Sequence, residues 1–450
     1  MVVPINKQTE EKNNHQHLTV GPDEKVSRGQ SILLGLQHVL AMDVYVVPFI
    51  IAMLISLQAG QSTALIQSTF IAAGIATIVQ TYFCMKLPVA QGPSFIPIGA
   101  IVGIYAASGG GINGWSTVLG ASLIAAILVI ILGFTGIFHK LIKSFVPPMV
   151  GGTIIFVVGL SLMPVALNDN IYNAVGATVT QNVYLALISG TMLILCVMLG
   201  SLFQNNGRVF RITSVIISLM VGCIAASFMG VLDLSAVAEA KWFSLPQIPF
   251  IDFSFSFNPS AIITMIIIYV VLMAETTGTW FAVSNVIDKP LTDQNINRGV
   301  IGEGIGCLVA SLLGTTPVTG YSTNAGIISI TGVASRIVFV VAGVWFVLFG
   351  FSSKLSALIS SIPSAVIGGV FVIICGVIAI SGMKVMKNEH IGEKEMYVIA
   401  VPMILTLALT FIPDDFLYAL PTTLQYLFNS PVATAAIVAI ILNKLLPSVK

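Results

Sequence analysis

The chain has 450 residues, of which 56% are hydrophobic and 8% charged, and its formal net charge is +1. A soluble domain carries about 25% charged residues, so this composition excludes a water-soluble globular protein, and the balanced charge does not indicate a nucleic-acid partner. Long apolar runs recur from end to end and predict an all-α, multi-pass protein of the lipid bilayer.

The N-terminal segment is polar and lacks the apolar core that a signal peptide needs. We expect residues 1–30 to form a short, disordered cytoplasmic tail, in which His15 and His17 are solvated. The five cysteines fall within apolar segments and lack metal-ligand spacing, so no metal site is expected.

Apolar runs of about 20 residues can cross the bilayer as helices. Two segments, 87–108 and 299–335, are apolar on average but are interrupted by Gly, Pro, Ser and Thr. Counted as one and two crossings, they bring the expected total to fourteen. The uninterrupted candidates begin near Ser31, Thr63, Trp115, Phe145, Asn182, Phe210, Ala261, Val338, Val366, Met396 and Val432.

The distribution of positive charge tests this count, because cytoplasmic loops carry an excess of Lys and Arg. With the N-terminus inside, fourteen spans leave only Lys241 and Lys354 outside, out of 19 Lys and Arg residues. A miscount by one span in the middle of the chain would scramble this partition. The sequence therefore predicts fourteen spans in the cell (cytoplasmic) membrane, with both termini in the cytoplasm.

Fourteen spans divide into two halves of seven, 31–232 and 259–450, joined by an extracellular loop at 233–258. Because seven is odd, the halves would enter the membrane from opposite sides, as inverted repeats. The interrupted segments then fall in spans three and ten, the third span of each half. Paired, Gly/Pro-interrupted segments at matching positions indicate the midplane site of a secondary transporter. The alternative is a pair of re-entrant loops with a purely structural role.

The interruptions predict two short extended strips, each followed by a half-helix. In the first strip, LPVAQGPSFIPIG (87–99), Pro93 lacks an N–H group and disfavours helix before it. In the second, Pro317, Gly320 and Gly326 bracket the stretch from Tyr321 to Asn324. Non-helical backbone at membrane depth must be buried in protein or line a cavity. Free amides and the positive N-terminal ends of the half-helices would then face a ligand.

Three acidic residues, Asp43, Glu275 and Glu303, lie well inside apolar spans. A charge at the bilayer centre costs at least about 2.5–3.5 kcal/mol on insertion scales, so each is a candidate functional residue. Neither glutamate has a Lys or Arg in the spans as a partner. A buried carboxyl of this kind can bind and release a proton as its access alternates.

Two polar residues of the first span have more than one interpretation. His38, in LLGLQHVLAMD, could orient or relay the proton, or it could be a packing residue with satisfied hydrogen bonds. Asp43 could be a cavity residue, an ion-coupling site or a structural partner of polar groups elsewhere.

Four motifs resemble those of the nucleobase–ascorbate transporter family, also called nucleobase:cation symporter-2. LGLQHVLAM (34–42) resembles its first-span signature, QGPSFIPIGA (91–100) its third-span strand, and the segment around Glu275 its substrate-gripping eighth span. GEGIGCLVASLLGTTPVTGYSTNAGIISITGVASR (302–336) resembles its longest motif. The order and spacing of the matches extend over essentially the whole chain.

This resemblance implies a core domain of spans one to four and eight to eleven, and a gate domain of spans five to seven and twelve to fourteen. Family members usually form homodimers and move nucleobases by an elevator-like displacement of the core, coupled to protons in bacteria. The implied protein is a permease that needs no cofactor besides the coupling proton, and it is not an enzyme.

The resemblance also implies roles for individual residues. Glu275 would hold the ring N–H groups of a nucleobase, and Phe95 would offer a ring and backbone from the first strip. Glu275, Glu303 and His38 would be the proton-coupling candidates. The substrate-binding candidates are Glu275, Phe95, Ser94, Tyr321, Ser322, Thr323, Asn324 and Thr279.

The chain departs from the family pattern in ways that bear on the substrate. Thr323 stands where relatives have Glu or Gln, and Thr279 stands where uracil carriers have His. The first span, which contains Asp43, is shorter than usual before Pro48. The stretch TTPVTGYS favours uracil, whereas TGVASR favours xanthine or uric acid; losing the long acceptor at Thr323 favours a ligand other than uracil.

Two other functions compete with nucleobase transport. One is an inorganic or organic anion carrier of the same fold, such as the sulfate permeases, although an anion would sit poorly beside an ionised Glu275. The other is a membrane-embedded enzyme, which would need a metal-ligand set or a nucleophile with its base. No such set appears in the sequence, and Ser322 has no nearby His.

Overall fold

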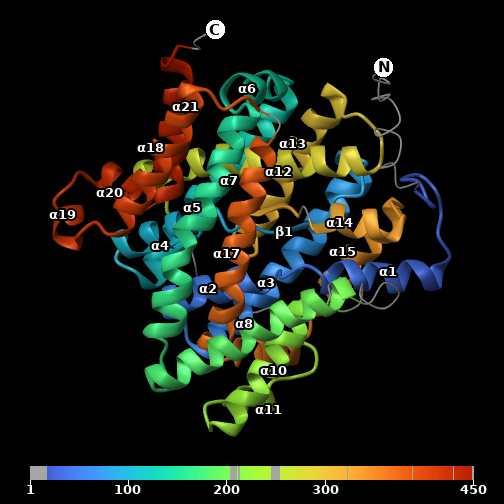
Figure 1. The fold of residues 1–450 in the computed structure, drawn as a ribbon, viewed down its shortest axis with the longest axis vertical. Helices are drawn as coiled ribbons and strands as arrows, with labels where there is room; N and C mark the ends of the chain where they lie inside the picture. Colours follow the sequence, from blue (N-terminus) through green and yellow to red (C-terminus); the bar gives the residue numbers. More distant parts are fainter. Residues whose placement is uncertain are drawn as a thin grey trace, which may run out of the picture.

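The structure, a computed structural model, describes residues 18–202, 210, 213–244, 254–321, 323–387, 389–428 and 430–447. Helices surround a short two-stranded sheet near the centre of the molecule (Figure 1). The expected extracellular loop at 233–258 is described at residues 233–244 and 254–258 only.

The first half of the chain holds eleven described elements and two π-helical turns. They are α1 (Arg28–Leu40), α2 (Val46–Leu54), α3 (Ala59–Ile78) with the turn Val79–Cys84, β1 (Gln91–Pro93), α4 (Ile98–Ala107), α5 (Gly111–Thr135), α6 (Phe138–Phe145), α7 (Pro148–Pro164) with the turn Val165–Tyr172, α8 (Val179–Leu202), α10 (Ser214–Phe228) and α11 (Ser235–Glu239).

The second half repeats the mixture of long helices and one short strand. Its elements are α12 (Pro259–Val286), α13 (Asp293–Leu312), β2 (Val318–Gly320), α14 (Thr323–Thr331), α15 (Arg336–Gly350), α16 (Ser353–Ser360), α17 (Ser364–Met386), α18 (Glu393–Thr410), α19 (Asp414–Tyr418), α20 (Thr422–Phe428) and α21 (Pro431–Leu445).

Six helical segments are long and apolar enough to cross a membrane: α3 and α7 with their π-helical turns, α5, α8, α12 and α17. A seventh candidate is α15 with α16, which are bent by 78° at their junction. Helices α4, α10 and α21 are apolar but shorter. Within the described residues, the structure therefore confirms a mostly helical, multi-pass membrane protein. The count of fourteen spans stays a prediction.

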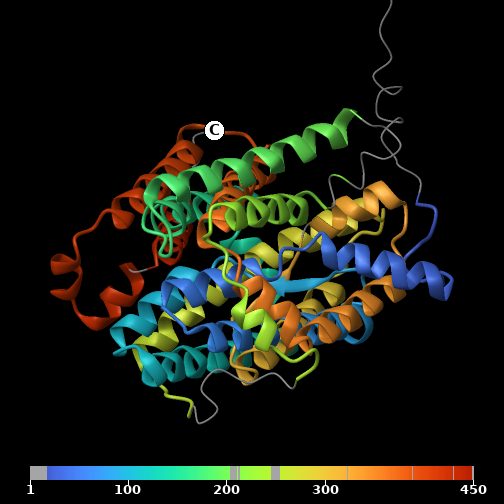
Figure 2. The same cartoon turned by 90° about the horizontal axis from the view of Figure 1, so that it is seen from below.

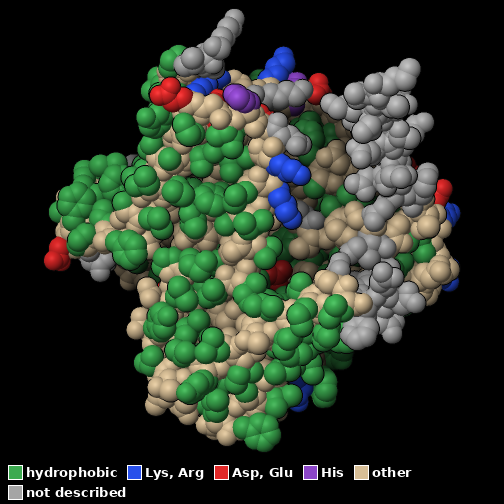
Figure 3. Space-filling model, viewed as in Figure 1, with side chains coloured by type: hydrophobic (Ala, Val, Ile, Leu, Met, Phe, Trp, Pro, Cys, Tyr) green, Lys and Arg blue, Asp and Glu red, His purple; other side chains and the backbone are tan. Residues whose placement is uncertain are grey.

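Apolar side chains cover much of the surface seen in Figure 3. Leu187 and Ile194 of α8 and Phe228 of α10 are among the exposed ones, whereas Trp115 and Trp280 are fully buried. Exposed apolar side chains on long helices are suited to contact lipid tails. The polar groups that matter for function are consequently in the interior.

The two strands pair antiparallel, with Gln91 opposite Gly320 and Pro93 opposite Val318. The backbone N–H of Tyr321 extends the pairing to the carbonyl of Ala90 at 3.0 Å. Figure 2 shows β1 enclosed between helices. Each strand is followed by a short helix, α4 or α14, so the expected strip and half-helix arrangement is present in both halves.

The second strip differs from the prediction in its position. The sequence places it over Tyr321–Asn324, but β2 covers Val318–Gly320 and helix α14 already begins at Thr323. The strand ends earlier because β1 pairs with Val318–Gly320, with Pro93 opposite Val318 and Gln91 opposite Gly320.

Helix α13 packs closely beside this sheet because two of its positions lack side chains. A Cβ atom at Gly302 would lie 1.9 Å from Oε1 of Gln80, in the π-helical turn after α3. A Cβ atom at Gly306 would lie 2.8 Å from Cβ of Ala76 and 3.0 Å from Cγ2 of Val318. The glycines therefore let α3, α13 and β2 meet around Glu303.

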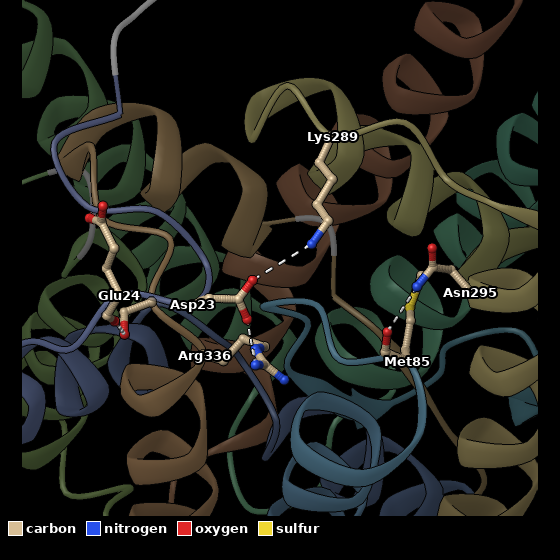
Figure 4. Close-up of polar contacts among 7 residues, drawn as sticks. Asp23, Glu24, Met85, Lys289, Asn295 and Arg336 are labelled. Carbon is tan, nitrogen blue, oxygen red and sulfur yellow. Dashed lines mark hydrogen bonds and ion pairs between the residues drawn. The ribbon is translucent and has the colours of Figure 1, made fainter.

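Part of the segment expected as a tail is folded onto the body of the protein. Val20 forms a parallel bridge with Val333, and the N–H of Thr19 donates to the carbonyl of Gly332 at 2.8 Å. Asp23 pairs with Arg336, and its other oxygen lies 3.7 Å from Nζ of Lys289 (Figure 4). Residues 18–30 are thus not a free tail, and residues 1–17 lie outside the described part of the chain.

Candidate functional site

Glu275 lies on α12 and faces the end of the first strip. Its Oε2 accepts a hydrogen bond of 2.8 Å from Oγ of Ser94, which directly follows β1. Ser94 Oγ also accepts from the N–H of Ile96 at 3.2 Å, so the hydroxyl is oriented toward the carboxylate. Thr319 of β2 lies beside the same carboxyl. Glu275 is half-buried, so its carboxyl keeps some accessible surface.

Glu303 lies on α13 and has no accessible surface. Nε2 of Gln80 donates to Glu303 Oε2 at 3.4 Å and to the carbonyl of Gly299 at 3.0 Å. The side chains of Gln91 and Thr276 also lie beside this carboxyl. Glu303 is therefore held by the turn after α3, whereas Glu275 is held by the first strip, and the two carboxyls lie within electrostatic reach of one another.

Two threonines of α12 hold the second strand. The N–H of Gly320 donates to Oγ1 of Thr276 at 3.1 Å, and Oγ1 of Thr279 donates to the carbonyl of Gly320 at 3.0 Å. Glu275 is therefore carried by the helix that also fixes β2. The ligand contact expected of Thr279 stays a prediction, since its hydroxyl already bonds to the strand.

Tyr321 covers the first strip. Its Oη donates to the carbonyl of Pro93 at 2.9 Å, and a Cβ atom at Gly92 would lie 2.6 Å from the Tyr321 ring. Glycine at position 92 thus allows the ring to lie flat on β1. Phe95 is partly buried, and its ring stacks on Phe371 of α17 at 6.0 Å.

His38 of α1 is buried and contacts the start of α14. Its Nδ1 lies 2.8 Å from Oδ1 of Asn324, which can only accept, so this nitrogen carries the proton. Nδ2 of Asn324 donates to the carbonyl of Tyr321 at 3.2 Å, and the His38 ring lies 4.3 Å from that of Phe339. This arrangement orients Asn324 and the second strip; a role for His38 in proton transfer stays a prediction.

Within the described part of the chain, no side-chain hydrogen bond joins the remaining predicted site residues to Glu275 or the strands. Thr323 is the first residue of α14 and its side chain is exposed, while Ser322 lies outside the described residues. The first span, expected to be continuous, is instead interrupted between α1 and α2, and the interruption contains Asp43. In the sequence, the feature that indicates this break is the short distance between the polar Asp43 and Pro48.

Figure 3 shows a recess on the viewed face, with acidic side-chain atoms at its floor. Among the described residues, no group of three or more His, Cys, Asp or Glu could hold a metal ion. The arrangement offers carboxylate and hydroxyl groups, which can accept hydrogen bonds from the N–H donors of a ligand.

Comparison with known proteins identifies the family. A family model described as Permease family matches residues 29–415. The xanthine permease of Bacillus subtilis (strain 168) is 32% identical over 422 residues, covering 92% of this chain and 93% of the relative. The uric acid permease PucK of the same organism is 31% identical, covering 92% and 95%. A uracil permease of Bacillus caldolyticus is 30% identical, covering 93% and 92%.

Solved structures agree on the fold. The transmembrane domain of the cyanobacterial bicarbonate transporter BicA superposes with a TM-score of 0.62 at 14% sequence identity, covering 87% of this chain and 98% of that domain. At this identity the likeness concerns the fold alone. The family model and these relatives, which match along nearly the whole chain, show that the chain belongs to the permease family of xanthine, uric acid and uracil carriers, the nucleobase:cation symporter-2 family.

Proposed function

We propose that this protein is a secondary active transporter that imports a nucleobase, either xanthine or uric acid or else uracil, across the cytoplasmic membrane. The observation that carries the proposal is the contact between Glu275 and Ser94 in front of the paired strands. It presents an accessible carboxylate where the two halves of the chain meet. The relatives named above are permeases for these three compounds.

Glu275 binds the ligand by accepting hydrogen bonds from its ring N–H groups. Ser94 occupies Oε2 of the carboxylate, and a carboxylate has about four acceptor positions on its two oxygens. The remaining positions are available to the edge of a planar base. Phe95 and Tyr321 provide flat surfaces near the same strand, which suits an aromatic ligand.

Transport is driven by proton symport and uses an elevator movement of a core domain against a gate domain. Glu275, Glu303 and His38 are the proton-coupling groups in this proposal. The contact between Phe95 and Phe371 joins a core strip to a helix assigned to the gate, so it must break or slide during the movement.

The proposed topology has fourteen spans in two inverted seven-span repeats, both termini in the cytoplasm, and a homodimer as the assembly. Contacts between loops support this arrangement. Asp23, Lys289 and Arg336, all assigned to the cytoplasmic side, lie together. Lys354 and Trp242, both assigned to the outside, also lie together, with Nζ of Lys354 4.9 Å from the ring centre.

An anion carrier is the alternative for this fold. The segments that build the site, 87–108, 259–286 and 299–335, contain no Lys or Arg. Two carboxyls at the strand pair would repel an anion, and no positive side chain in these segments would offset the repulsion. The site chemistry therefore favours a neutral ligand with N–H donors.

The proposal is tested by uptake of labelled xanthine, uric acid and uracil in cells that lack their own carriers and express this protein. We expect saturable accumulation of at least one base, and we expect a protonophore to abolish the accumulation. If no base accumulates although the protein reaches the membrane, nucleobase transport is wrong. If accumulation survives the protonophore, proton coupling is wrong.

A further inference from the structure

A third interruption lies beside the two strands, and nothing above assigns it a function. Helix α1 ends at Leu40 and α2 begins at Val46. The gap is tied to the start of α14, because Nδ2 of Asn324 lies 3.4 Å from Sδ of Met42. The break in the first span therefore opens at the same place as the second strip.

Asp43 occupies this gap. It lies deep in the protein but keeps accessible surface, as Glu275 does, whereas Glu303 has none. Two of the three intramembrane carboxyls are thus accessible to a small ligand, and Glu303 is not.

The Asp43 carboxyl has unused acceptor capacity. The backbone amide of Asp43 itself donates to it. Among the described residues, no side-chain hydrogen bond or ion pair to this carboxyl is found. An unpaired carboxylate at membrane depth is costly unless a ligand or a cavity compensates it. Donors supplied by a ligand would compensate it.

Tyr321 relates Asp43 to the proposed ligand site. The Tyr321 side chain lies within the electrostatic influence of both Asp43 and Glu275. Its ring rests on Gly92 of β1, and its hydroxyl is engaged by Pro93. An aromatic side chain near two separate carboxyls suits a planar ligand that carries N–H donors on two different edges.

We propose that Asp43 is a second substrate-recognition carboxylate, which accepts an N–H group on a different edge of the base from the edge held by Glu275. The inference rests on the proposed function and names its substrate class. A bicyclic oxopurine has N–H groups on both rings and spans further than a single pyrimidine ring. The ligand is therefore an oxopurine such as xanthine or uric acid.

The test on the unaltered protein measures how well 1-, 3-, 7- and 9-methylxanthine inhibit uptake of labelled xanthine. Each methyl group removes or blocks one edge position. We expect strong loss of inhibition, about tenfold or more, at positions on two different edges, because a hydrogen bond to a charged group contributes about 1.5–3 kcal/mol. Sensitivity confined to a single edge would overturn the role of Asp43.

The variant Asp43→Asn then assigns the second edge. We expect it to raise the KM for xanthine about tenfold with a smaller change in maximal rate. We also expect that a methyl group at one of the two sensitive positions no longer weakens inhibition, whereas a methyl group at the other position still does. Asp233→Asn, a change of the same kind on an exposed loop, is the matched control for expression and uptake.

Other outcomes are equally decisive. If Asp43→Asn keeps the methylxanthine profile but loses accumulation while exchange continues, Asp43 couples ions and the inference is wrong. If Asp43→Asn does not reach the membrane, Asp43→Ser is measured with the same methylxanthines and should lose its sensitivity to only one of the two methyl positions; unchanged sensitivity to both would overturn the inference. If the unaltered protein accumulates no base at all, the proposed function is wrong. If it takes up xanthine but is sensitive to methyl groups on one edge only, the proposed function stands and the role of Asp43 is wrong.

Discussion

Glu275 and Glu303 are the same residue type on two consecutive helices, and both approach the strand pair at membrane depth. Glu275 keeps accessible surface and accepts from Ser94, a residue of the strip itself. Glu303 is fully buried and accepts from Gln80 in the π-helical turn behind the sheet. An ionisable side chain in a membrane is a functional candidate, but its surroundings decide the function. We therefore propose ligand binding for the accessible carboxyl of Glu275, and positioning of the strands or proton exchange for the buried carboxyl of Glu303.

The largest effect is expected for Glu275→Gln. The amide loses the negative charge and half of its acceptor capacity, so the charge-assisted bonds to ring N–H groups weaken. We expect uptake to fall about 100-fold, with the amount of protein in the membrane unchanged. Uptake of the labelled base, normalised to surface protein, measures this. Near-normal uptake would contradict the assignment of ligand binding to Glu275 and not to Glu303.

Gly302→Ala tests the packing around the buried Glu303. The new Cβ atom would lie 1.9 Å from Oε1 of Gln80, so the side chain that holds Glu303 must move. We expect a loss of about 1–3 kcal/mol of stability from this overpacking. The thermal midpoint of the purified protein measures the loss. Gly376→Ala on α17 is the matched control, since a Cβ atom added there would have no neighbour within 4 Å; equal midpoints for the two variants would contradict the tight packing around Glu303.

Glu303→Gln should have a smaller effect on transport than Glu275→Gln. The amide retains an oxygen that can accept from Gln80, and Glu303 has no accessible surface, so the proposal assigns it no contact with the ligand. We expect the maximal uptake rate to fall about tenfold while the KM changes less than about threefold. Initial-rate kinetics separate the two parameters. A large increase in KM with little change in rate would place Glu303 in the binding site instead.

Ser94→Ala should produce the smallest effect. It removes the hydroxyl that orients Glu275 but leaves the carboxylate in place. This bond affects the ligand only through the orientation of Glu275, so we expect about a fivefold increase in KM, equivalent to about 1 kcal/mol. Ser94→Thr, which retains the hydroxyl, serves as the control. If both variants behave like the unaltered protein, the contact does not orient Glu275 for binding.

Much of the site could be predicted from local sequence. Pro93, Pro317 and Gly320 mark the two interruptions because their effects on the backbone are local. Glu275 and Glu303 stand out because charge is rare within apolar runs. The membrane class follows from composition alone.

Long-range contacts could not be predicted in the same way. The contact between His38 and Asn324 joins residues 286 positions apart, and the contact between Gln80 and Glu303 joins residues 223 apart. Nothing in either segment specifies its partner. The register of β2 likewise depends on which residues of β1 lie opposite, so local sequence places the second strip too late in the chain.

The break in the first span is harder to predict from the sequence than the two strips are. Asp43 and Pro48 lie close together in an otherwise apolar stretch, but a single polar residue is compatible with both a continuous helix and a break. Similarly, the contacts of residues 19–24 with 332–336 come from a segment whose polarity alone suggests a free tail.

Direct contact of the ligand with Glu275, and not with Glu303, is the central claim. The most direct measurement is the thermal stabilisation of the purified protein by xanthine, compared among the unaltered protein, Glu275→Gln and Glu303→Gln. We expect a concentration-dependent rise in midpoint for the unaltered protein and for Glu303→Gln, and no rise for Glu275→Gln. Stabilisation of Glu275→Gln equal to that of the unaltered protein would contradict the claim.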